Sequence, residues 1–360
     1  MGLEAAWNIR IGRMPVGPRN LISDVPGVTV GHCTIQDNEI QTGVTALLPH
    51  GGNLFREKVL AASHVINGFG KSMGLIQIDE LGTIETPIIL TNTLSAGTAY
   101  TALVRYMLSQ NSDIGDTTGT VNPIVCECND GYINDIRSLA VQEHHVMEAL
   151  RRCGADFEEG AVGAGRGMSC HQMKGGIGSA SRVVTIGSDA YTVGALLLTN
   201  HGMKDDLLIA NDPIGRRIPD VRPRDKDKGS CIILIATDAP LSERQLKRIC
   251  KRAVVGLSRT GSYIGNGSGE IAIAFTTANR VPHYPQQSVI PLSMLHDENI
   301  NGIFRAVAEA VEESVLSSML HAGTITGFKG RRLLSLSEFI EGQPEGGKAD
   351  LWKKSEDKKP

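Results

Sequence analysis

Short apolar runs separated by turn residues divide the chain into predicted strands and helices. Runs that are apolar throughout, or that alternate between apolar and polar residues, are typical of strands in a buried sheet. In the first half of the chain they cover residues 28–32, 43–48, 86–93 and 122–128, while residues 60–70 are expected to end in a loop at Gly68-Phe69-Gly70. Apolar positions spaced for one helix face predict helices over 95–110 and 138–151.

The second half of the chain repeats this alternation of strands and helices. Residues 182–186 and 191–199 predict a hairpin, and the apolar runs that begin at Ser230 and cover 270–275 predict buried strands. Ser242-Glu243-Arg244-Gln245 is a capping-box sequence that predicts one helix extending to Leu257, and a further helix is expected over 301–321. Alternating blocks of this kind predict layered α and β elements.

A charged segment interrupts the pattern immediately before Ser230. Nine of the fourteen residues from Gly215 to Lys228 are charged, and the segment also contains two prolines. Such a composition predicts an exposed tether, and it is the only candidate boundary in an otherwise single domain spanning 1–360. From residue 343 to the end the chain is polar and charged, and we expect a disordered tail.

Composition and charge exclude several classes of partner. Hydrophobic residues make up 41% of the 360 residues, aromatic residues 4%, and the formal net charge is −3. Without a basic patch or a stacking surface, the protein is not expected to bind nucleic acid or anionic lipid. Apolar runs are too short to span a membrane, and residues 1–14 lack the apolar core of a signal peptide.

Cysteine usage indicates a reducing compartment. The seven cysteines are odd in number, scattered, and contain no C-x-x-C pair. Free thiols in a cytoplasmic protein fit this distribution best. Cys126 and Cys128 share one face of a predicted strand, where burial is expected rather than metal binding. We therefore expect neither a metal nor a cofactor.

Gly229-Ser230 is the part of the sequence that most strongly suggests a catalytic nucleophile. A serine preceded by glycine and an exposed tether, at the start of a buried strand, is how a chain could expose a nucleophile made by its own cleavage. Without a Cβ, Gly229 lets the peptide bond before Ser230 adopt conformations closed to other residues. Cleavage there would free an α-amine on Ser230 that titrates near neutral pH and acts as a base for its own hydroxyl. An ordinary turn before a core strand explains the same residues.

Polar residues at strand ends are candidates for the rest of such a site, because a strand end holds a side chain at a fixed angle. Ser268 and Glu270 share a strand face, so the carboxylate could orient the hydroxyl or move protons to and from Ser230. The amide of Asn200 is the kind of donor that stabilises an oxyanion. Asn92 and Glu127 also end predicted strands. Capping and turn closure are the alternative roles of each residue taken singly.

Other motifs for catalysis or nucleotide binding are weak. Neither H-E-x-x-H nor G-x-S-x-G is present. Lys174-Gly175-Gly176-Ile177-Gly178-Ser179 departs from the phosphate-loop spacing, so it indicates either a loop around a phosphate or tight backbone packing.

Several sequence blocks together resemble the DmpA-like P1 peptidase family, which contains L-aminopeptidase/D-amidase-esterase enzymes and β-aminopeptidases. The resemblance runs in order from about residue 20 to about residue 330. Its blocks are Ile22-Ser23-Asp24-Val25-Pro26-Gly27-Val28, Pro87-Ile88-Ile89-Leu90-Thr91-Asn92-Thr93, Glu127-Cys128-Asn129-Asp130-Gly131, Lys174-Gly175-Gly176-Ile177-Gly178, Asn200-His201-Gly202, Gly229-Ser230 and Gly267-Ser268-Gly269-Glu270.

The resemblance implies an αββα sandwich similar to the Ntn hydrolases and self-cleavage into chains 1–229 and 230–360. It places the nucleophile at Ser230, the proton-transfer pair at Ser268 and Glu270, and the oxyanion donor at Asn200. By the same resemblance Glu127 would bind the substrate's free amine, Tyr132 would line the active site, and cleaved protomers would form a tetramer. The substrate would be a small peptide or an amino-acid amide or ester.

Four alternatives remain open from the sequence. An acyltransferase could use the same fold and site, and a shifted cleavage could expose Cys231 as the nucleophile. A non-catalytic scaffold would never cleave itself, although it would not need Ser230, Ser268 and Glu270 together. A nucleotide-binding protein would use the loop at 174–181.

Overall fold

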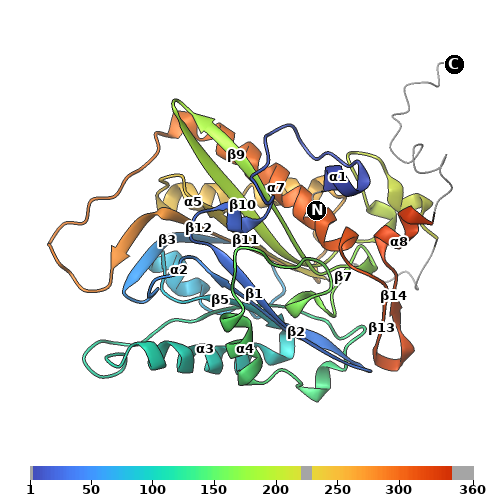
Figure 1. The fold of residues 1–360 in the computed structure, drawn as a ribbon, viewed down its shortest axis with the longest axis horizontal. Helices are drawn as coiled ribbons and strands as arrows, with labels where there is room; N and C mark the ends of the chain where they lie inside the picture. The colour runs from blue at the N-terminus through green and yellow to red at the C-terminus, as the bar shows by residue number, and fades with distance from the viewer. Residues whose placement is uncertain (1–2, 220–228, 343–360) are drawn as a thin grey trace.

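The protein folds into four layers, with two β-sheets stacked between two layers of helices (Figure 1). The computed structural model describes residues 3–219 and 229–342. Each sheet buries one face against the other sheet and one face against helices, so strands in both sheets are apolar on both faces. The predicted αββα sandwich is confirmed.

The smaller sheet has four strands in the order β1-β2-β5-β6. Its strands are β1 (Thr29–Asp37), β2 (Ile40–Leu48), β5 (Ile88–Asn92) and β6 (Ile124–Cys128). Helices α3 (Ala96–Gln110) and α4 (Glu143–Arg151) cover its outer face. Because β5 and β6 are parallel, their polar ends meet at one edge of the sheet, where Thr91 pairs with Glu127.

The larger sheet has six strands in the order β4-β3-β12-β11-β10-β9. They are β3 (Glu57–Gly68), β4 (Thr83–Ile84), β9 (Ile177–Ile186), β10 (Asp189–Asn200), β11 (Ser230–Thr237) and β12 (Gly269–Pro282). Its outer face packs against α5 (Glu243–Cys250), α6 (Ala253–Arg259) and α7 (Asn301–Leu320). The central pair β11 and β12 is parallel, and the other strand pairs are antiparallel.

Short elements complete the described chain. These are α1 (Leu3–Trp7), α2 (Leu75–Leu81), α8 (Leu336–Glu341), and the two-residue strands β7 (Ser169–Cys170), β8 (Met173–Lys174), β13 (Ile325–Thr326) and β14 (Arg332–Leu333). Within the described ranges, the structure has no helix that is both long and apolar enough to cross a membrane.

Alternation along β11 decides which side chains face which core. Ile232 and Leu234 point into the core between the two sheets, whereas Cys231 and Ile233 point toward the helices. Ser230 begins this strand and Cys231 follows on the opposite face. Adjacent residues at the predicted cleavage point therefore have different surroundings.

Most predicted elements are confirmed, but several boundaries are wrong. Strands β1, β9 and β12 extend well beyond the predicted ranges 28–32, 182–186 and 270–275. Residues 60–68 belong to β3, which continues to Gly68 because it pairs with β12. The helix predicted from 138 begins at Glu143, since Leu139 has a left-handed backbone (φ 50°). The single helix predicted over 242–257 is two helices, because the N–H groups of Arg252 and Val255 bond to carbonyls three residues earlier and tighten the turn.

The predicted tether is also wrong at its start. Ile214–Arg217 forms a short 3-10 helix in which Ile214 and Gly215 are buried. Lys204 Nζ donates to the carbonyl oxygens of Gly215 (3.1 Å) and Ile218 (2.8 Å), which fixes this segment to the domain. Residues 220–228 of the tether and the predicted tail from 343 lie outside the described residues.

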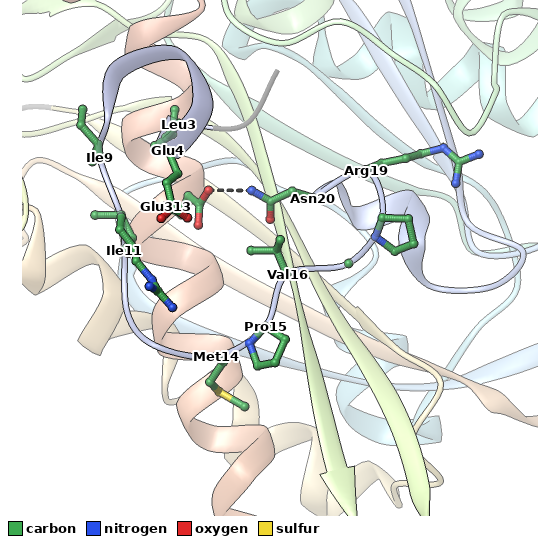
Figure 2. A pocket seen from close by; sticks show the side chains of 13 residues that line it. Leu3, Glu4, Ile9, Ile11, Met14, Pro15, Val16, Arg19, Asn20 and Glu313 are labelled. Atoms are coloured by element: carbon green, nitrogen blue, oxygen red, sulfur yellow. Dashed lines mark hydrogen bonds between the residues drawn. The ribbon is translucent and has the colours of Figure 1, made fainter.

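A buried ion cluster joins β9 to α7. Arg182 is fully buried, and its guanidinium contacts the carboxylates of Glu313 (2.5 Å) and Glu309 (3.4 Å). It also donates to the Ile11 carbonyl at 2.9 Å, which ties the N-terminal segment to the same cluster. Figure 2 shows that Glu313 and Asn20 lie at a cavity of about 420 Å³ beneath this segment. None of the candidate catalytic residues lines that cavity.

We predict that Arg182→Met destabilises the protein by about 3–5 kcal/mol, because two buried carboxylates lose their counter-charge. The midpoint of urea unfolding measures the effect. The control is Arg105→Met, which removes an exposed arginine paired with the half-exposed Glu143 and should cost about 0–1 kcal/mol. Equal, small losses in both variants would contradict the prediction.

Candidate active site

Strand register brings two of the predicted residues, and a glycine between the other predicted pair, into one row at the end of the larger sheet. Ser230, the first residue of β11, pairs with Asn200 at the end of β10 on one side. On the other side it pairs with Gly269 at the start of β12. The sequence separates these residues by 30 and 39 positions, and only the sheet makes them neighbours.

The hydroxyl of Ser230 lies against the peptide bond that it is predicted to cleave. Ser230 Oγ is 2.7 Å from the carbonyl oxygen of Gly229. The backbone N–H of Gly269 donates to the same oxygen at 3.2 Å. A donor in this position stabilises the negative charge that develops on the oxygen when a nucleophile attacks the carbonyl carbon.

Close packing explains the glycine at position 229. A Cβ built on Gly229 would lie 2.2 Å from the Asn200 carbonyl oxygen and 2.5 Å from the Cα of His201. Both are backbone atoms of β10 and its extension, so no side-chain movement could relieve the clash. Gly229 therefore lets the cleavage point approach the strand that carries Asn200.

Ser268 and Glu270 form the predicted pair. Both are fully buried, and the Ser268 hydroxyl donates to Glu270 Oε1. Glu270 lies opposite Cys231 in the parallel pairing of β11 and β12. The carboxylate is thus in register with the residue after Ser230, and it is hydrogen-bonded to the Ser268 hydroxyl.

The amide of Asn200 is held in one orientation. Its Oδ1 accepts from the Ser169 N–H at 2.9 Å, and its Nδ2 donates to the Asn129 carbonyl at 3.0 Å. These contacts identify the nitrogen of the amide and leave its second hydrogen for another acceptor. Burial raises the pKa of the neighbouring Asp130 carboxyl to about 7, so the Asn129-Asp130 turn carries little charge at acidic pH.

Glu127 reaches the same region from the smaller sheet. Its carboxylate accepts from the Lys71 N–H at 2.7 Å and from the Thr93 hydroxyl. The segment Phe69-Gly70 lies between Glu127 and the start of β12. A Cβ built on Gly70 would lie 3.5 Å from Glu127 Oε1, and a Cβ built on Gly269 would lie 2.5 Å from the Phe69 carbonyl oxygen. Burial, then the charges of Glu127, Cys231 and Glu270, raise the pKa of the Cys128 thiol, which lies among them.

Two other sequence candidates contact neighbouring turns and a hairpin. Asn92 caps the turn after β5 by accepting from the Ser95 N–H at 3.0 Å, and its amide donates to the Thr42 hydroxyl. Tyr132 lies in the turn after β6, with the guanidinium of Arg331 5.3 Å above its ring. Its carbonyl accepts from Arg331 Nη1 at 3.1 Å, so this turn is fixed to the hairpin of β13 and β14.

The structure argues against Cys231 as the nucleophile. Its side chain is fully buried in the core on the helix side of the sheet. Burial, together with the charges of Glu270 and Cys170, raises the pKa of this thiol well above its usual value. A thiol without access to solvent and with a raised pKa supplies little thiolate for attack.

The loop at 174–181 does not have the structure that the nucleotide-binding alternative requires. Lys174 is fully buried, and its Nζ donates to the carbonyls of Gly165 (3.0 Å) and Met168 (2.8 Å). Cβ atoms on Gly176 and Gly178 would lie 1.9 Å from the carbonyl oxygens of Gly160 and Ser314. The glycines therefore serve backbone packing, and the lysine satisfies loop carbonyls.

Sequence reasoning missed the groups that act through the backbone. The Gly269 N–H and the Ser169 N–H carry no side-chain signal, and Phe69-Gly70 was expected only as a loop. His201 follows Asn200 directly and is buried with Cys170 and His171, yet isolated histidines in a sequence do not indicate such a cluster.

Comparison with known proteins gives one consistent result. Peptidase family S58 matches residues 20–333. A curated relative, the β-peptidyl aminopeptidase BapA of Sphingosinicella microcystinivorans, is 35% identical over 342 residues, which cover 87% of this chain and 84% of BapA.

Solved structures agree in fold. A protein of Pyrococcus horikoshii OT3 is 52% identical with a TM-score of 0.91, over 95% of this chain and 98% of the other. The L-aminopeptidase D-Ala-esterase/amidase of Ochrobactrum anthropi is described as a prototype of the serine aminopeptidases and a variant of the Ntn hydrolase fold. It is 36% identical with a TM-score of 0.87, over 92% of this chain and 95% of the other. The resemblance to the DmpA-like peptidases is confirmed, and the chain belongs to peptidase family S58.

Proposed function

We propose that the protein is a self-processing serine aminopeptidase that releases N-terminal residues from small peptides, amino-acid amides or esters. The observation that carries this proposal is the contact of 2.7 Å between Ser230 Oγ and the Gly229 carbonyl oxygen, which also accepts from the Gly269 N–H. Membership of family S58 and the aminopeptidase activity of the named relatives support it.

Self-cleavage would proceed in two steps. Ser230 Oγ attacks the Gly229 carbonyl carbon, the carbon–nitrogen bond breaks, and the hydroxyl proton passes to the departing nitrogen. An ester then joins Gly229 to Ser230 Oγ, while the Ser230 nitrogen is a free amine. Water hydrolyses the ester, which leaves a carboxylate on Gly229 and restores the hydroxyl.

Substrate hydrolysis would reuse the same atoms. The Ser230 amine, whose usual pKa is about 7.7–8.0, takes the proton from Oγ as it attacks the substrate carbonyl. Removal of the Gly229 carbonyl exposes the Gly269 N–H, which with the Asn200 amide can hold the oxyanion. We assign the transfer of a proton to the leaving amine, before water releases the acid, to Ser268 and Glu270.

Glu127 is the candidate for binding the substrate's ammonium group. It is a buried carboxylate on the opposite sheet, separated from Gly269 by the segment Phe69-Gly70. A negative charge on this side of the segment Phe69-Gly70 would bind an ammonium group that lies a few bonds away from the attacked carbonyl. Binding of the ammonium group by Glu127 would make the enzyme prefer substrates with a free N-terminus. Both α- and β-amino acids have such a group.

We predict that Glu127→Gln raises KM for an amino-acid p-nitroanilide about 10- to 100-fold, with a smaller change in kcat, because a charge-assisted hydrogen bond to the substrate is lost. N-Acetylation of the substrate should abolish hydrolysis by the unmodified enzyme. Initial rates against substrate concentration measure both effects. Glu143→Gln, a half-exposed glutamate of α4, is the control. Equal rates on free and acetylated substrates would refute the aminopeptidase proposal.

Assembly and location extend the proposal. The family resemblance favours a tetramer of cleaved protomers, and the seven free cysteines favour the cytoplasm. Light scattering after size exclusion gives the assembly state directly, and a mass other than four protomers would contradict the tetramer.

A further inference from the structure

One cysteine and two histidines outside the proposed mechanism lie together beside the end of β10. The ligand atoms of Cys170, His171 and His201 are all within 4.8 Å of one another, and all three side chains are buried. Among the residues that the structure describes, no other group of three or more potential metal-binding side chains meets this distance.

Backbone hydrogen bonds hold the two segments that carry the cluster. The His171 N–H donates to the His201 carbonyl at 2.7 Å. One step earlier on each segment, the Ser169 N–H donates to Asn200 Oδ1 at 2.9 Å. The three side chains are therefore brought together by fixed backbone and not by a mobile loop.

The hydrogen bond of His171 fixes which of its nitrogens has a lone pair. Nδ1 lies 2.9 Å from the Met203 carbonyl oxygen. Because a carbonyl oxygen only accepts, Nδ1 carries the proton and Nε2 carries the lone pair. A histidine that donates one ring N–H to a backbone carbonyl keeps a lone pair on its other nitrogen, and this pairing is usual for metal-binding histidines.

His201 is the residue whose burial needs an explanation. Its side chain is 2% exposed, and within the described part of the chain neither ring nitrogen has a hydrogen-bond partner. A buried polar group without a partner is costly and therefore rare.

We propose that Cys170, His171 and His201 bind one Zn²⁺ ion. A thiolate with two imidazoles is a ligand set that suits zinc, with a fourth position for water. Zinc–ligand bonds are about 2.0–2.3 Å long. The ligand atoms, which now lie within 4.8 Å of one another, would therefore move slightly closer together when zinc binds. On binding, the Cys170 thiol forms the zinc–sulfur bond and releases its proton to solvent. Since the cluster is buried, the ion enters as the chain folds.

The ion would stabilise the backbone against which the cleavage point rests. His201 follows Asn200, and its Cα would lie 2.5 Å from a Cβ at Gly229. On the other side of the cluster, Cys170 and Cys231 belong to the same hydrophobic core. Zinc at this point would join segment 169–171 to the strand end that positions the candidate oxyanion donor. This role is separate from the peptidase chemistry.

Metal content of untagged protein, expressed with added zinc and dialysed against metal-free buffer, tests the site. We expect about one zinc per chain in the wild type, and less than about a tenth of that in Cys170→Ser and His201→Asn. The neighbours His144, which is exposed, and His145, which is half-buried, have ring centroids 3.9 Å apart and provide the control. The double variant His144→Ala/His145→Ala should keep its zinc. Protein refolded with Co²⁺ should show a sulfur-to-cobalt absorption band in the near ultraviolet.

Several results would overturn the proposal. These are a wild type without zinc, zinc unchanged in both ligand variants, or zinc lost in the control. If the ligand variants do not fold, X-ray absorption on the wild type decides, since one sulfur and two imidazole nitrogens are expected and a shell without sulfur would refute the site. Repeating the zinc assay on Ser230→Ala separates the outcome from the peptidase proposal, because that variant should keep its zinc without activity.

Discussion

Ser230→Ala is expected to remain one uncut chain and to lose about 10⁴-fold or more of its amide hydrolysis. The variant removes the proposed nucleophile, the hydroxyl oxygen that lies 2.7 Å from the Gly229 carbonyl oxygen. Without cleavage there is also no α-amine to act as base, so one substitution removes two groups of the site. Intact mass under denaturing conditions measures processing, and release of p-nitroaniline measures hydrolysis.

Two companion variants make the result decisive. Ser230→Cys keeps a nucleophilic atom in the same position and should retain partial cleavage. Cys231→Ala removes the neighbouring thiol from the helix-side core and should still be cut between Gly229 and Ser230. A wild type that stays at 38.5 kDa after long incubation, or a cut between Ser230 and Cys231, would contradict the proposed processing.

Glu270→Gln is expected to lower kcat about 10²- to 10⁴-fold with little change in KM, because a group that moves protons acts in the transition state more than in binding. The substitution preserves shape and still offers an acceptor to the Ser268 hydroxyl, but it removes the negative charge. Steady-state kinetics on cleaved protein measure the effect, and Tm verifies that the buried site is intact.

Coupling to Ser268 distinguishes proton transfer from structural support. If the two side chains act as one relay, Ser268→Ala and the double variant should lose about as much activity as Glu270→Gln alone, since residues that act as a unit are non-additive. Fully additive losses would show that Ser268 and Glu270 act separately. A kcat within about threefold of the wild type would remove Glu270 from the mechanism.

The sequence predicted the layers of the fold better than the order in which strands pair. Apolar runs such as 232–236 are unambiguous because a strand covered on both faces has no polar positions to interrupt it. Helix boundaries at Leu139 and Arg252 were missed, since a left-handed residue and a tightened turn depend on tertiary packing. The pairing of Ser230 with Asn200 and Gly269 is a property of sheet order, which local patterns do not contain.

Glycines were interpreted least accurately. The freedom of Gly229 was expected to serve its own backbone conformation, but the structure shows that it serves close approach of the His201 backbone. Likewise the glycines after Lys174 indicate packing against carbonyls and not a phosphate site. A glycine in a sequence does not show which neighbouring atom packs against its Cα. Sequence alone therefore cannot distinguish close packing from backbone flexibility or phosphate binding.

The strand order of the larger sheet has a consequence for the protein after cleavage. Cutting at Gly229 would assign β3, β4, β9 and β10 to one product and β11 and β12 to the other, so the second product's strands lie between strands of the first. The mature enzyme would then be a heterodimer of two chains that share one sheet. The first chain would lack the two middle strands of the sheet, and the second chain would lack the strands on either side of them. Its unfolding would separate two molecules, and reassembly would depend on concentration in a way that folding of the precursor does not. The peptide bond at Gly229 would thus be needed to build the sheet and dispensable once the sheet is formed.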